Sequence, residues 1–337
     1  MMSELELNKY VTPDGSLDGR LLWKREPLYR GMNGRCVERF YPSPEQSYIF
    51  KPLTNGESVD REAWIYRHVL SLFPPIFPKL LAVSMEGAGE AGWSIFEDLG
   101  PLRHDFDLEL AKDVVERMAW WHAFPVSHWR GLTGHGVKPP IEQIAADVLK
   151  RWDEAGALLN DIEEYSGFGQ REMNALIRGL ANADGQSLSG IRVLSHGDLH
   201  LGNYARGADG RLYILDWEHA HMNTPYWDLY HLIDISHPMF PKKITIPERE
   251  MLLDYYLRQS ARQGCEWERE AFIRGYFRFS AAFSLWMLLL IAGDLERGDS
   301  VWPKDRLLKQ REETRDHLIG CLSRISSGLT GNFTQKD

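Results

Sequence analysis

Short apolar segments, broken by Gly, Pro and Asn, make up the chain from about residue 20 to residue 100. Residues 21–41, LLWKREPLYRGMNGRCVERFY, predict two strands around a turn at Met32-Asn33-Gly34. Further strands are predicted at SYIFKPL (47–53), FPKLLAVSM (77–85) and AGWSIFEDL (91–99). Residues 58–72 predict a helix, with Ser58 as its N-cap. The apolar face of this helix consists of Ala63, Tyr66, Val69 and Leu70.

From about residue 107 onward the apolar spacing becomes that of helices. One helical face over residues 109–123 consists of Leu110, Val114, Met118 and Trp121. Similar spacing predicts helices over residues 141–159, 249–262 and 269–293. The longest uncharged run, 279–293, is shorter than the ~20 residues that a membrane-spanning helix needs, and it favours a buried core helix. Strands followed by helices indicate an α+β fold.

The composition is that of an ordinary globular chain, with 337 residues, 43% hydrophobic and 26% charged. The net charge of −9 argues against nucleic acid or an acidic membrane as the main partner. This charge serves solubility, with attraction of a cationic substrate as the alternative. The three cysteines, Cys36, Cys265 and Cys321, form no CxxC pair, and residues 1–15 carry no apolar signal segment. We therefore expect a reduced, cytoplasmic setting.

Two polar segments interrupt this pattern, each directly after an apolar run. HGDLHLGN (196–203) follows IRVLS, and DWEH (216–219) follows LYIL. We expect two short neighbouring strands, with a loop between them, to bring Asp198, Asn203 and Asp216 close together where they end. Asn203 and Asp216 then offer oxygen ligands for Mg²⁺, which leaves its other positions to water and phosphate. Asp198 stays free of the metal and able to accept a proton from an attacking hydroxyl, as phosphoryl transfer requires.

HGDLHLGN followed by LDWE resembles the catalytic loop and metal-binding motif of the aminoglycoside phosphotransferase and choline kinase family, which has the protein-kinase-like fold. The resemblance covers roughly residues 20–320. It implies two lobes, with residues 1–98 as a nucleotide-binding lobe built on a small antiparallel sheet and residues 99–327 as a mostly helical catalytic and substrate lobe. Residues 328–337 would be a frayed tail. ATP with Mg²⁺ would lie between the lobes and give its γ-phosphoryl group to a small-molecule hydroxyl.

The same resemblance assigns the nucleotide contacts. Lys51, in the strand YIFKPL, would hold the α- and β-phosphates, and Glu62, on the predicted helix, would pair with it. Surface positions for both are the alternative. A glycine-containing loop would let backbone amides approach the phosphates, although an ordinary hairpin turn explains it equally well. The loop residues are Gly31, Asn33 and Gly34. The backbones of Glu97 and Leu99 would meet the adenine edge.

Support for the catalytic loop is expected from Asp228 in PYWDLYHLI, through the backbone amides of the loop, with simple N-capping of a helix as the alternative. His196 would pack and hydrogen-bond to hold the loop. His200 is left between loop packing and contact with phosphate or substrate. Glu218 is a second metal ligand, a negative lip or a solvated carboxylate.

Two departures separate this chain from protein kinases. Gly197 stands where they carry Arg, and Asp216-Trp217-Glu218 stands where they carry Asp-Phe-Gly. Only residues 218–224 separate the metal motif from the PYWDL segment. These features fit small-molecule kinases, and they argue against a protein substrate and against a loop gated by phosphorylation.

Two other functions stay open. A metal-dependent hydrolase would use a two-metal cluster of imidazoles and carboxylates, but it gives no role to Lys51 or Glu62. The cluster would consist of His196, Asp198, His200, Asp216, His219 and His221. A catalytically silent nucleotide-binding module would use the fold for contact with a partner.

The acceptor is not indicated by any motif. An acidic second lobe suits a cationic alcohol such as an aminoglycoside, choline or an amino sugar, while homoserine, methylthioribose, fructosamine and other sugars stay open. Residues 104–190 and 236–330 are expected to build the acceptor pocket. The choice between ATP and GTP and the oligomeric state stay open as well.

Overall fold

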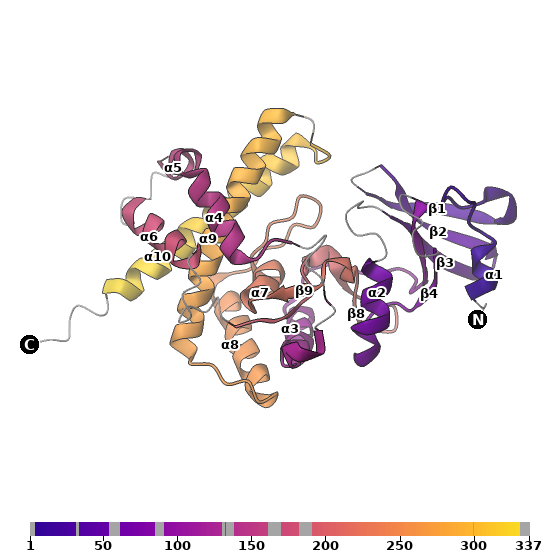
Figure 1. The fold of residues 1–337 in the computed structure, drawn as a ribbon, viewed down its shortest axis with the longest axis horizontal. Helices are drawn as coiled ribbons and strands as arrows, with labels where there is room; N and C mark the ends of the chain where they lie inside the picture. The colour runs from indigo at the N-terminus through magenta and orange to yellow at the C-terminus, as the bar shows by residue number, and fades with distance from the viewer. Residues whose placement is uncertain are drawn as a thin grey trace, which may run out of the picture.

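A five-stranded antiparallel sheet forms the N-terminal lobe in the computed structural model of the protein (Figure 1). The structure describes residues 4–31, 34–53, 61–84, 91–129, 132, 138–160, 170–181, 191–298 and 300–330. The strands are β1 (Lys24–Arg30), β2 (Cys36–Ser43), β3 (Gln46–Pro52), β4 (Leu80–Val83) and β5 (Trp93–Glu97), in the order β1-β2-β3-β5-β4. Each strand predicted in this part of the chain is therefore present.

Alternation along β3 decides what each face of the sheet meets. Tyr48, Phe50 and Pro52 are buried, and the intervening residues point to the opposite face. Tyr48 and Phe50 pack with Leu7 of helix α1 (Glu4–Asn8), which covers the outer face of the sheet. Lys51 therefore projects from the other face, on the side of the second lobe.

The helix predicted over residues 58–72 is present but shorter. It forms α2 (Arg61–His68), followed by a 3-10 turn at Leu70–Leu72. The predicted apolar face is confirmed, since all four of its residues are buried: Ala63, Tyr66, Val69 and Leu70. Two consecutive prolines follow the turn and prevent the helix from continuing. Ser58, the predicted N-cap, lies outside the described residues.

The second lobe is mostly helical and lies on the other side of α2 in Figure 1. Its helices are α3 (Leu108–His122), α4 (Ile141–Lys150), α5 (Trp152–Asn160), α6 (Gln170–Ala181), α7 (Tyr226–Ile233), α8 (Ile246–Arg262), α9 (Arg269–Arg297) and α10 (Lys304–Thr330). Short strands pair as β6 (Val193–Ser195) with β9 (His221–Asn223) and β7 (Tyr204–Arg206) with β8 (Leu212–Ile214). The predicted two-lobed α+β architecture is confirmed.

Several boundaries in the helical lobe differ from the prediction. The helix predicted over residues 141–159 is divided into α4 and α5 at Arg151, whose backbone leaves the helical region with φ −103° and ψ 31°. Helix α8 begins earlier than predicted, because Thr245 and Glu248 form a capping box. Helix α10 runs to Thr330, so the chain is still helical where the frayed tail is predicted to begin. The apolar spacing predicts neither α6 nor α10.

Helix α9 contains the long uncharged run of residues 279–293. Among the described helices, α9 alone is long and apolar enough to cross a membrane by length and composition, but 72% of its most apolar window is buried inside the protein. The prediction of a core helix here is confirmed by that burial.

One hydrophobic core joins α2 to the second lobe. Phe73, just after α2, packs against Trp121 of α3 and against Trp217, with ring centroids 6.4 Å and 5.4 Å away. Both tryptophans are fully buried. Since α2 shares this core, the helix that carries Glu62 is held in place relative to the segment that follows Asp216.

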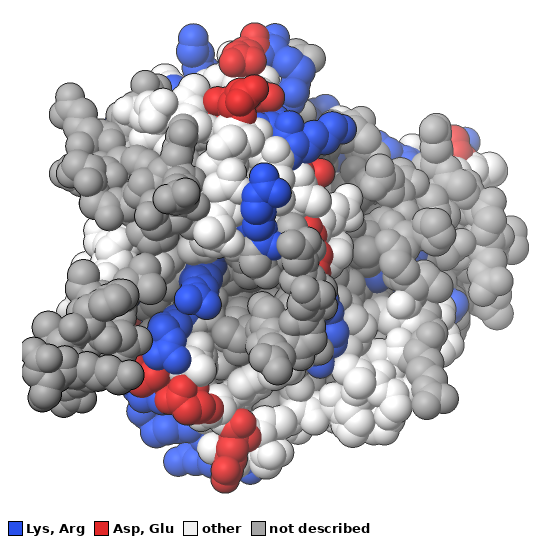
Figure 2. Space-filling model, turned by 60° about the vertical axis from the view of Figure 1, so that its left-hand side comes forward, with Lys and Arg blue, Asp and Glu red and all other residues white. Residues whose placement is uncertain are grey.

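Basic and acidic side chains are mixed on the surface. On the face drawn in Figure 2, Lys and Arg lie near Asp and Glu, without one large region of a single sign. The net charge of −9 is therefore a poor guide to the local field, which depends on the residues that line each site.

Candidate active site

Asp228, on α7, holds the loop that follows β6. Its Oδ1 accepts hydrogen bonds from the Ser195 hydroxyl (2.6 Å) and the Gly197 amide (3.2 Å), and its Oδ2 accepts one from the His196 amide (2.8 Å). His122 of α3 donates to the same Oδ2 at 3.2 Å. These donors belong to the end of β6, to the loop after it and to α3, so N-capping of α7 does not account for the buried carboxylate.

We expect Asp228→Asn to lower the free energy of unfolding by about 3 kcal/mol, because an amide cannot accept all of these hydrogen bonds in a buried place. Burial opposes ionisation, but His122 and the other donors hold the pKa of Asp228 well below its usual 3.8. A depressed folded pKa stabilises the protein fully above 3.8, and this stabilisation is lost as the pH falls below that value.

Denaturant unfolding at several pH values checks this prediction. The difference in unfolding free energy between the wild type and the variant should become smaller below about pH 4. Asp254→Asn is the matched control, because Asp254 forms a surface ion pair with Arg269. Its stability should match the wild type within about 0.5 kcal/mol. A difference in unfolding free energy that does not change with pH would contradict the proposed ionised state of Asp228.

Gly197 stands where the loop passes closest to the metal-motif segment. Its φ is +90°, a region that disfavours side chains, and a Cβ there would lie 2.1 Å from the His219 carbonyl oxygen. Its own carbonyl accepts a hydrogen bond from Trp227 Nε1 at 2.9 Å. A side chain at this position would push the two segments apart.

Gly197→Ala should therefore destabilise the protein by about 3 kcal/mol and abolish most activity, because backbone strain and a clash with backbone act together. Gly210→Ala is the matched control, since Gly210 has φ +79° but a Cβ there would meet nothing within 4 Å. That variant carries only the strain of the left-handed backbone, about 1 kcal/mol. Thermal unfolding of the two variants separates the cost of backbone strain from the cost of the clash. Equal losses of stability in both variants would show that the close approach at Gly197 is unimportant.

His196 connects the two polar segments. Its Nε2–H donates to the Leu215 carbonyl at 2.8 Å, and its Nδ1 accepts the Asp198 amide at 3.3 Å. Just beyond the ends of β8 and β7, the Leu215 amide donates to the Asn203 carbonyl at 2.8 Å. Burial lowers the pKa of His196, so the ring is neutral, as this donor–acceptor pair requires. The sequence-based expectation that His196 holds the loop agrees with this geometry.

The strands that lead to the two segments are not neighbours. β6, which precedes Asp198, pairs with β9, whereas β8, which precedes Asp216, pairs with β7. The expectation of two adjacent strands is wrong, because residues 204–206 form a hairpin of their own with β8. Side-chain and backbone bonds through His196 and Leu215 bring the segments together instead.

Lys51 lies among three carboxylates. Its ammonium is 2.6 Å from Asp216 Oδ1, 3.1 Å from Glu62 Oε1 and 3.3 Å from Glu218 Oε2. Burial opposes its charge, but the carboxylates raise the pKa of Lys51, so it stays an ammonium. Burial and the nearby carboxylates of Asp216 and Glu218 raise the pKa of Glu62. The side chains of Lys51, Glu62 and Glu218 are 13%, 11% and 9% exposed, which excludes the surface alternatives for all three.

Arg61 ties α2 to the segment after Asp216. Its Nε donates to the Glu218 carbonyl at 2.9 Å and its Nη2 to the Ala220 carbonyl at 2.5 Å. The residue is 8% exposed and directly precedes Glu62. A buried guanidinium therefore fixes the two sides of the Lys51 cluster to each other.

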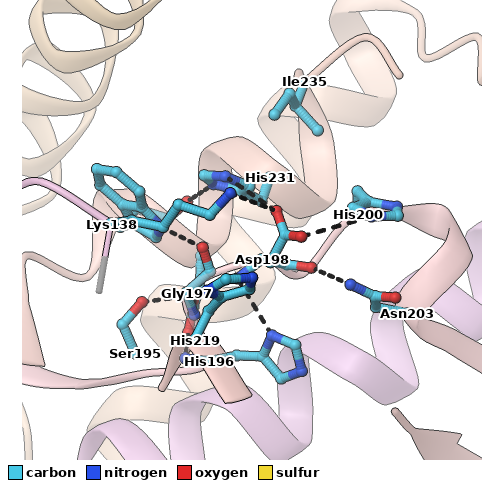
Figure 3. A network of polar contacts seen from close by, with 12 residues as sticks. Lys138, Ser195, His196, Gly197, Asp198, His200, Asn203, His219, His231 and Ile235 are labelled. Atoms are coloured by element: carbon cyan, nitrogen blue, oxygen red, sulfur yellow. Dashed lines mark hydrogen bonds and ion pairs between the residues drawn. The ribbon is translucent and has the colours of Figure 1, made fainter. Parts of the chain in front are cut away.

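Asp198 lies between basic groups that come from separate parts of the second lobe (Figure 3). Lys138 Nζ and His231 Nε2 are 3.9 Å and 4.0 Å from its Oδ1, and His200 Nε2 is 3.7 Å from its Oδ2. Its carbonyl accepts a 2.7 Å hydrogen bond from Asn203 Nδ2. Burial opposes ionisation, but Lys138 and the imidazoles hold the pKa of Asp198 well below its usual range. The carboxylate is therefore ionised at physiological pH.

The two imidazoles beside Asp198 differ at Nε2: that of His200 carries a hydrogen, and that of His231 carries a lone pair. His200 Nδ1 accepts the Gly202 amide at 3.0 Å, so the hydrogen of the neutral ring is on Nε2, toward Asp198. His231 Nδ1 donates to the Trp227 carbonyl at 2.8 Å, so its Nε2 presents a lone pair. Burial lowers the pKa of both rings to about 4. Both rings are thus neutral at physiological pH.

The glycine-containing loop does not offer its described amides to an anion. The amides of Gly31 and Gly34 donate to carbonyls inside the turn, at 2.8 Å and 2.9 Å. The prediction that these two amides approach a phosphate is corrected accordingly, since the hairpin turn already uses them. Asn33 lies outside the described residues.

The segment after β5 connects the two lobes. The Glu97 amide donates to the Lys79 carbonyl at 2.9 Å, so only the carbonyl of Glu97 is left for an adenine edge. Leu99 follows two residues later, outside the strand and partly buried. The contacts of the Glu97 and Leu99 backbones with an adenine edge stay predictions, and for Glu97 the carbonyl would make the contact.

Asn203 and Asp216 offer a donor set that fits a hard divalent cation. Asn203 uses its Nδ2 for the Asp198 carbonyl, which leaves Oδ1 as its acceptor atom. Asp216 is 35% exposed, and its backbone is left-handed, with φ 60° and ψ 60°, the only such non-glycine among the described residues. The carboxylates around Lys51 leave negative charge in excess. Carboxylate and amide oxygens beside excess negative charge suit Mg²⁺.

The cluster required by the hydrolase alternative is absent from the described part of the chain. No three His, Cys, Asp or Glu side chains of these residues are grouped so that they could hold a metal ion. His196 and His221 donate instead to backbone carbonyls, each at 2.8 Å. These imidazoles hold loops together.

Several residues that face the site have no signal in the sequence. Lys138 and Arg61 lie outside every motif, and His231 lies in an apolar helix. Burial and the charges of Asp216 and Asp198 raise the pKa of Tyr29 on β1. Only the folded chain brings these positions together, so no local pattern could have found them.

The two lobes, with a Lys51–Glu62–Asp216 cluster beside the loop of Asp198 and Asn203, define a protein-kinase-like phosphotransferase. Residues 46–272 match the profile of the family described as "Phosphotransferase enzyme family". The match covers more than half of the chain, and the chain belongs to this family. The class predicted from HGDLHLGN and LDWE, a small-molecule kinase, is confirmed. No curated protein matches the sequence.

Solved structures share the fold over nearly the whole chain. A putative aminoglycoside phosphotransferase from Ralstonia eutropha JMP134 is 16% identical, with 95% of this chain and 97% of that one covered and a TM-score of 0.60. The choline kinase LicA from Streptococcus pneumoniae is 17% identical, with 89% and 94% covered and a TM-score of 0.54. A spectinomycin phosphotransferase in complex with ADP and spectinomycin is 13% identical, with 91% and 94% covered and a TM-score of 0.57. At these identities the likeness shows the fold.

Proposed function

We propose that the protein transfers the γ-phosphoryl group of ATP, bound with Mg²⁺, to a hydroxyl group of a small molecule. The observation that carries this proposal is the contact of Lys51 with both Glu62 (3.1 Å) and Asp216 (2.6 Å), beside the loop of Asp198 and Asn203. Phosphoryl transfer needs a cation on the donor phosphates, oxygen ligands for the metal and a carboxylate at the acceptor. The complex of the spectinomycin phosphotransferase with ADP supports a nucleotide site in this fold.

In this proposal Asp198 positions the acceptor. The hydroxyl donates a hydrogen bond to the carboxylate, and its oxygen forms a bond to the γ-phosphorus while the bond from that phosphorus to the bridging oxygen breaks. ADP leaves, and the proton passes to Asp198 and then to solvent. Because its pKa is depressed, Asp198 is a weak base. A loose transition state needs little deprotonation before attack, so orientation is its main contribution.

The nucleotide side would depend on groups that are already assembled. Asn203 Oδ1 and Asp216 would hold the metal, which would supply charge compensation for the phosphates. Lys51 stays protonated beside its carboxylates and would bind the α- and β-phosphates, while Glu62 keeps it in position. Glu218 adds a further negative group beside Lys51, at 3.3 Å.

Calorimetric titration with MgATP and a coupled assay of ADP release over a panel of hydroxylated small molecules test the proposal. We expect MgATP binding, slow ADP release with water as acceptor, and a strong increase with at least one alcohol. MgATP binding without transfer to any alcohol would favour the silent nucleotide-binding module. Absence of MgATP binding would exclude both functions for this site.

A further inference from the structure

The acceptor side of Asp198 carries a lysine that the nucleotide cluster does not use. Lys138 comes from the segment directly before α4, far in the sequence from Lys51 and Asp216. Its ammonium is 3.9 Å from Asp198 Oδ1, and Figure 3 shows it reaching over the carboxylate from the side of His231. The side chain is 38% exposed, so a solute in the site can reach it.

Lys138 has hydrogen-bonding capacity to spare. A separation of 3.9 Å from Asp198 is too long for a hydrogen bond, and Lys138 makes none to any residue that the structure describes. A lysine ammonium has three hydrogens to donate. The group is therefore a charged donor placed beside the proposed acceptor carboxylate.

Stacked aromatic rings continue from His200 on this side. His200 stacks on His237, with ring centroids 4.2 Å apart and planes 16° apart, and both rings lie against Phe240. His200 Nδ1 accepts the Gly202 amide at 3.0 Å and His237 Nδ1 accepts the Met239 amide at 3.2 Å, as neutral imidazoles do. These rings form an uncharged aromatic wall.

Among the described residues, Asp198 is the one carboxylate within ion-pair distance of Lys138. Asp234, the acid at the end of α7, is 1% exposed and is bound to Arg249 and Tyr276 behind the helix. Lys242 donates to the carbonyls of His231 and Ile235 at 3.0 Å each, and burial lowers its pKa to about 7, so it is not a second strong cation on this side. A cationic group of the acceptor would face the Lys138 ammonium here, and no described carboxylate besides Asp198 would pair with it.

We propose that the acceptor alcohol carries an oxyanionic group near its reacting hydroxyl and that Lys138 binds this group. The inference rests on the proposed function and reverses the expectation of a cationic acceptor drawn from the overall charge. A hydroxyl that donates to Asp198 at about 2.7 Å lies within a few carbon atoms of an anion on Lys138. Short hydroxy acids, sugar acids and sugar phosphates have this arrangement.

Matched acceptors that differ in charge test the inference. Gluconate, glucose and glucosamine supply an acid, a neutral alcohol and an amine on one carbon skeleton, and glucose 6-phosphate distinguishes a phosphate from a carboxylate. We expect the highest kcat/KM with an anionic member. In Lys138→Met the ratio of kcat/KM for that anion over glucose should fall about 30-fold, mainly through KM, as loss of a charge-assisted hydrogen bond implies.

Two further variants separate binding from a structural effect. Lys138→Arg should keep the preference for the anion, because it keeps the charge. Lys150→Met, in the last turn of helix α4, removes an exposed lysine remote from Asp198 and should match the wild type. Where turnover is too slow to measure, calorimetric titration of the Mg·ADP-loaded protein with gluconate and with glucosamine gives the same comparison.

Three outcomes would overturn the inference: a better rate or tighter binding with glucosamine than with every anion, an unchanged anion preference in Lys138→Met, or no detectable binding of any anion. A rise in the KM for ATP equal to that for the acceptor would also overturn it, because Lys138 would then serve the nucleotide. Failure of the proposed function is distinguishable, since the wild type would then neither bind MgATP nor release ADP with water as acceptor.

Discussion

Replacement of Asp198 by asparagine should reduce phosphoryl transfer about 1,000-fold, within the range that a positioned acid–base group contributes. The amide has the same shape but neither accepts the proton nor attracts the acceptor hydroxyl with a full charge. The affinity for MgATP should stay within about two-fold of the wild type, since the nucleotide cluster is centred on Lys51. Single-turnover kinetics with saturating MgATP measure the first quantity, and calorimetry measures the second.

Asp113→Asn is the matched control for this variant. Asp113 pairs with Arg206 on the surface of the same lobe, at 2.7 Å, and is 47% exposed. Its activity should equal that of the wild type. If Asp198→Asn kept full activity on the true acceptor, the role proposed for this carboxylate would be wrong.

Asp216→Asn should weaken MgATP binding at least 100-fold, equivalent to about 2.7 kcal/mol. The substitution removes the charged oxygen proposed to bind the metal and the carboxylate nearest to Lys51, at 2.6 Å. Lys51 keeps Glu62 and Glu218 as partners, so the free energy of unfolding should change by less than about 1 kcal/mol. Calorimetric titrations with ATP at several Mg²⁺ concentrations measure the loss.

Nucleotide binding with and without Mg²⁺ distinguishes a metal-binding role of Asp216 from an effect through Lys51. Binding of ADP without Mg²⁺ should be nearly the same in Asp216→Asn and in the wild type, because no metal is involved. Asp209→Asn is the matched control, since Asp209 lies in the turn between β7 and β8 and pairs with Arg211. Equal losses with and without Mg²⁺ would mean that Asp216 acts only through Lys51.

Much of the fold could be predicted because its signals are local. The alternation of Tyr48, Phe50 and Pro52 sets both the strand and the face that carries Lys51. The apolar run of α9 is readable for the same reason, as burial follows from composition. The polar segments with Asp198 and Asp216 stand out because each follows an apolar run.

The remaining features depend on contacts between distant parts of the chain. The pairing of β6 with β9 could not be predicted, since three-residue strands carry too little pattern to select a partner. Lys138 and Arg61 reach the site from segments without a motif, and only tertiary packing brings them there. The charge of the acceptor side could not be read from composition either, because it depends on which few side chains face Asp198.

The bond of Arg61 to the Glu218 and Ala220 carbonyls has a consequence for control of the enzyme. In a kinase-like fold, outward motion of the helix that carries the glutamate partner of the lysine would silence the catalyst. Here that motion would break the buried hydrogen bonds of Arg61 and separate the Phe73 ring from Trp217. We therefore expect the protein to be permanently competent, so that cellular flux follows the supply of its two substrates and the amount of protein made.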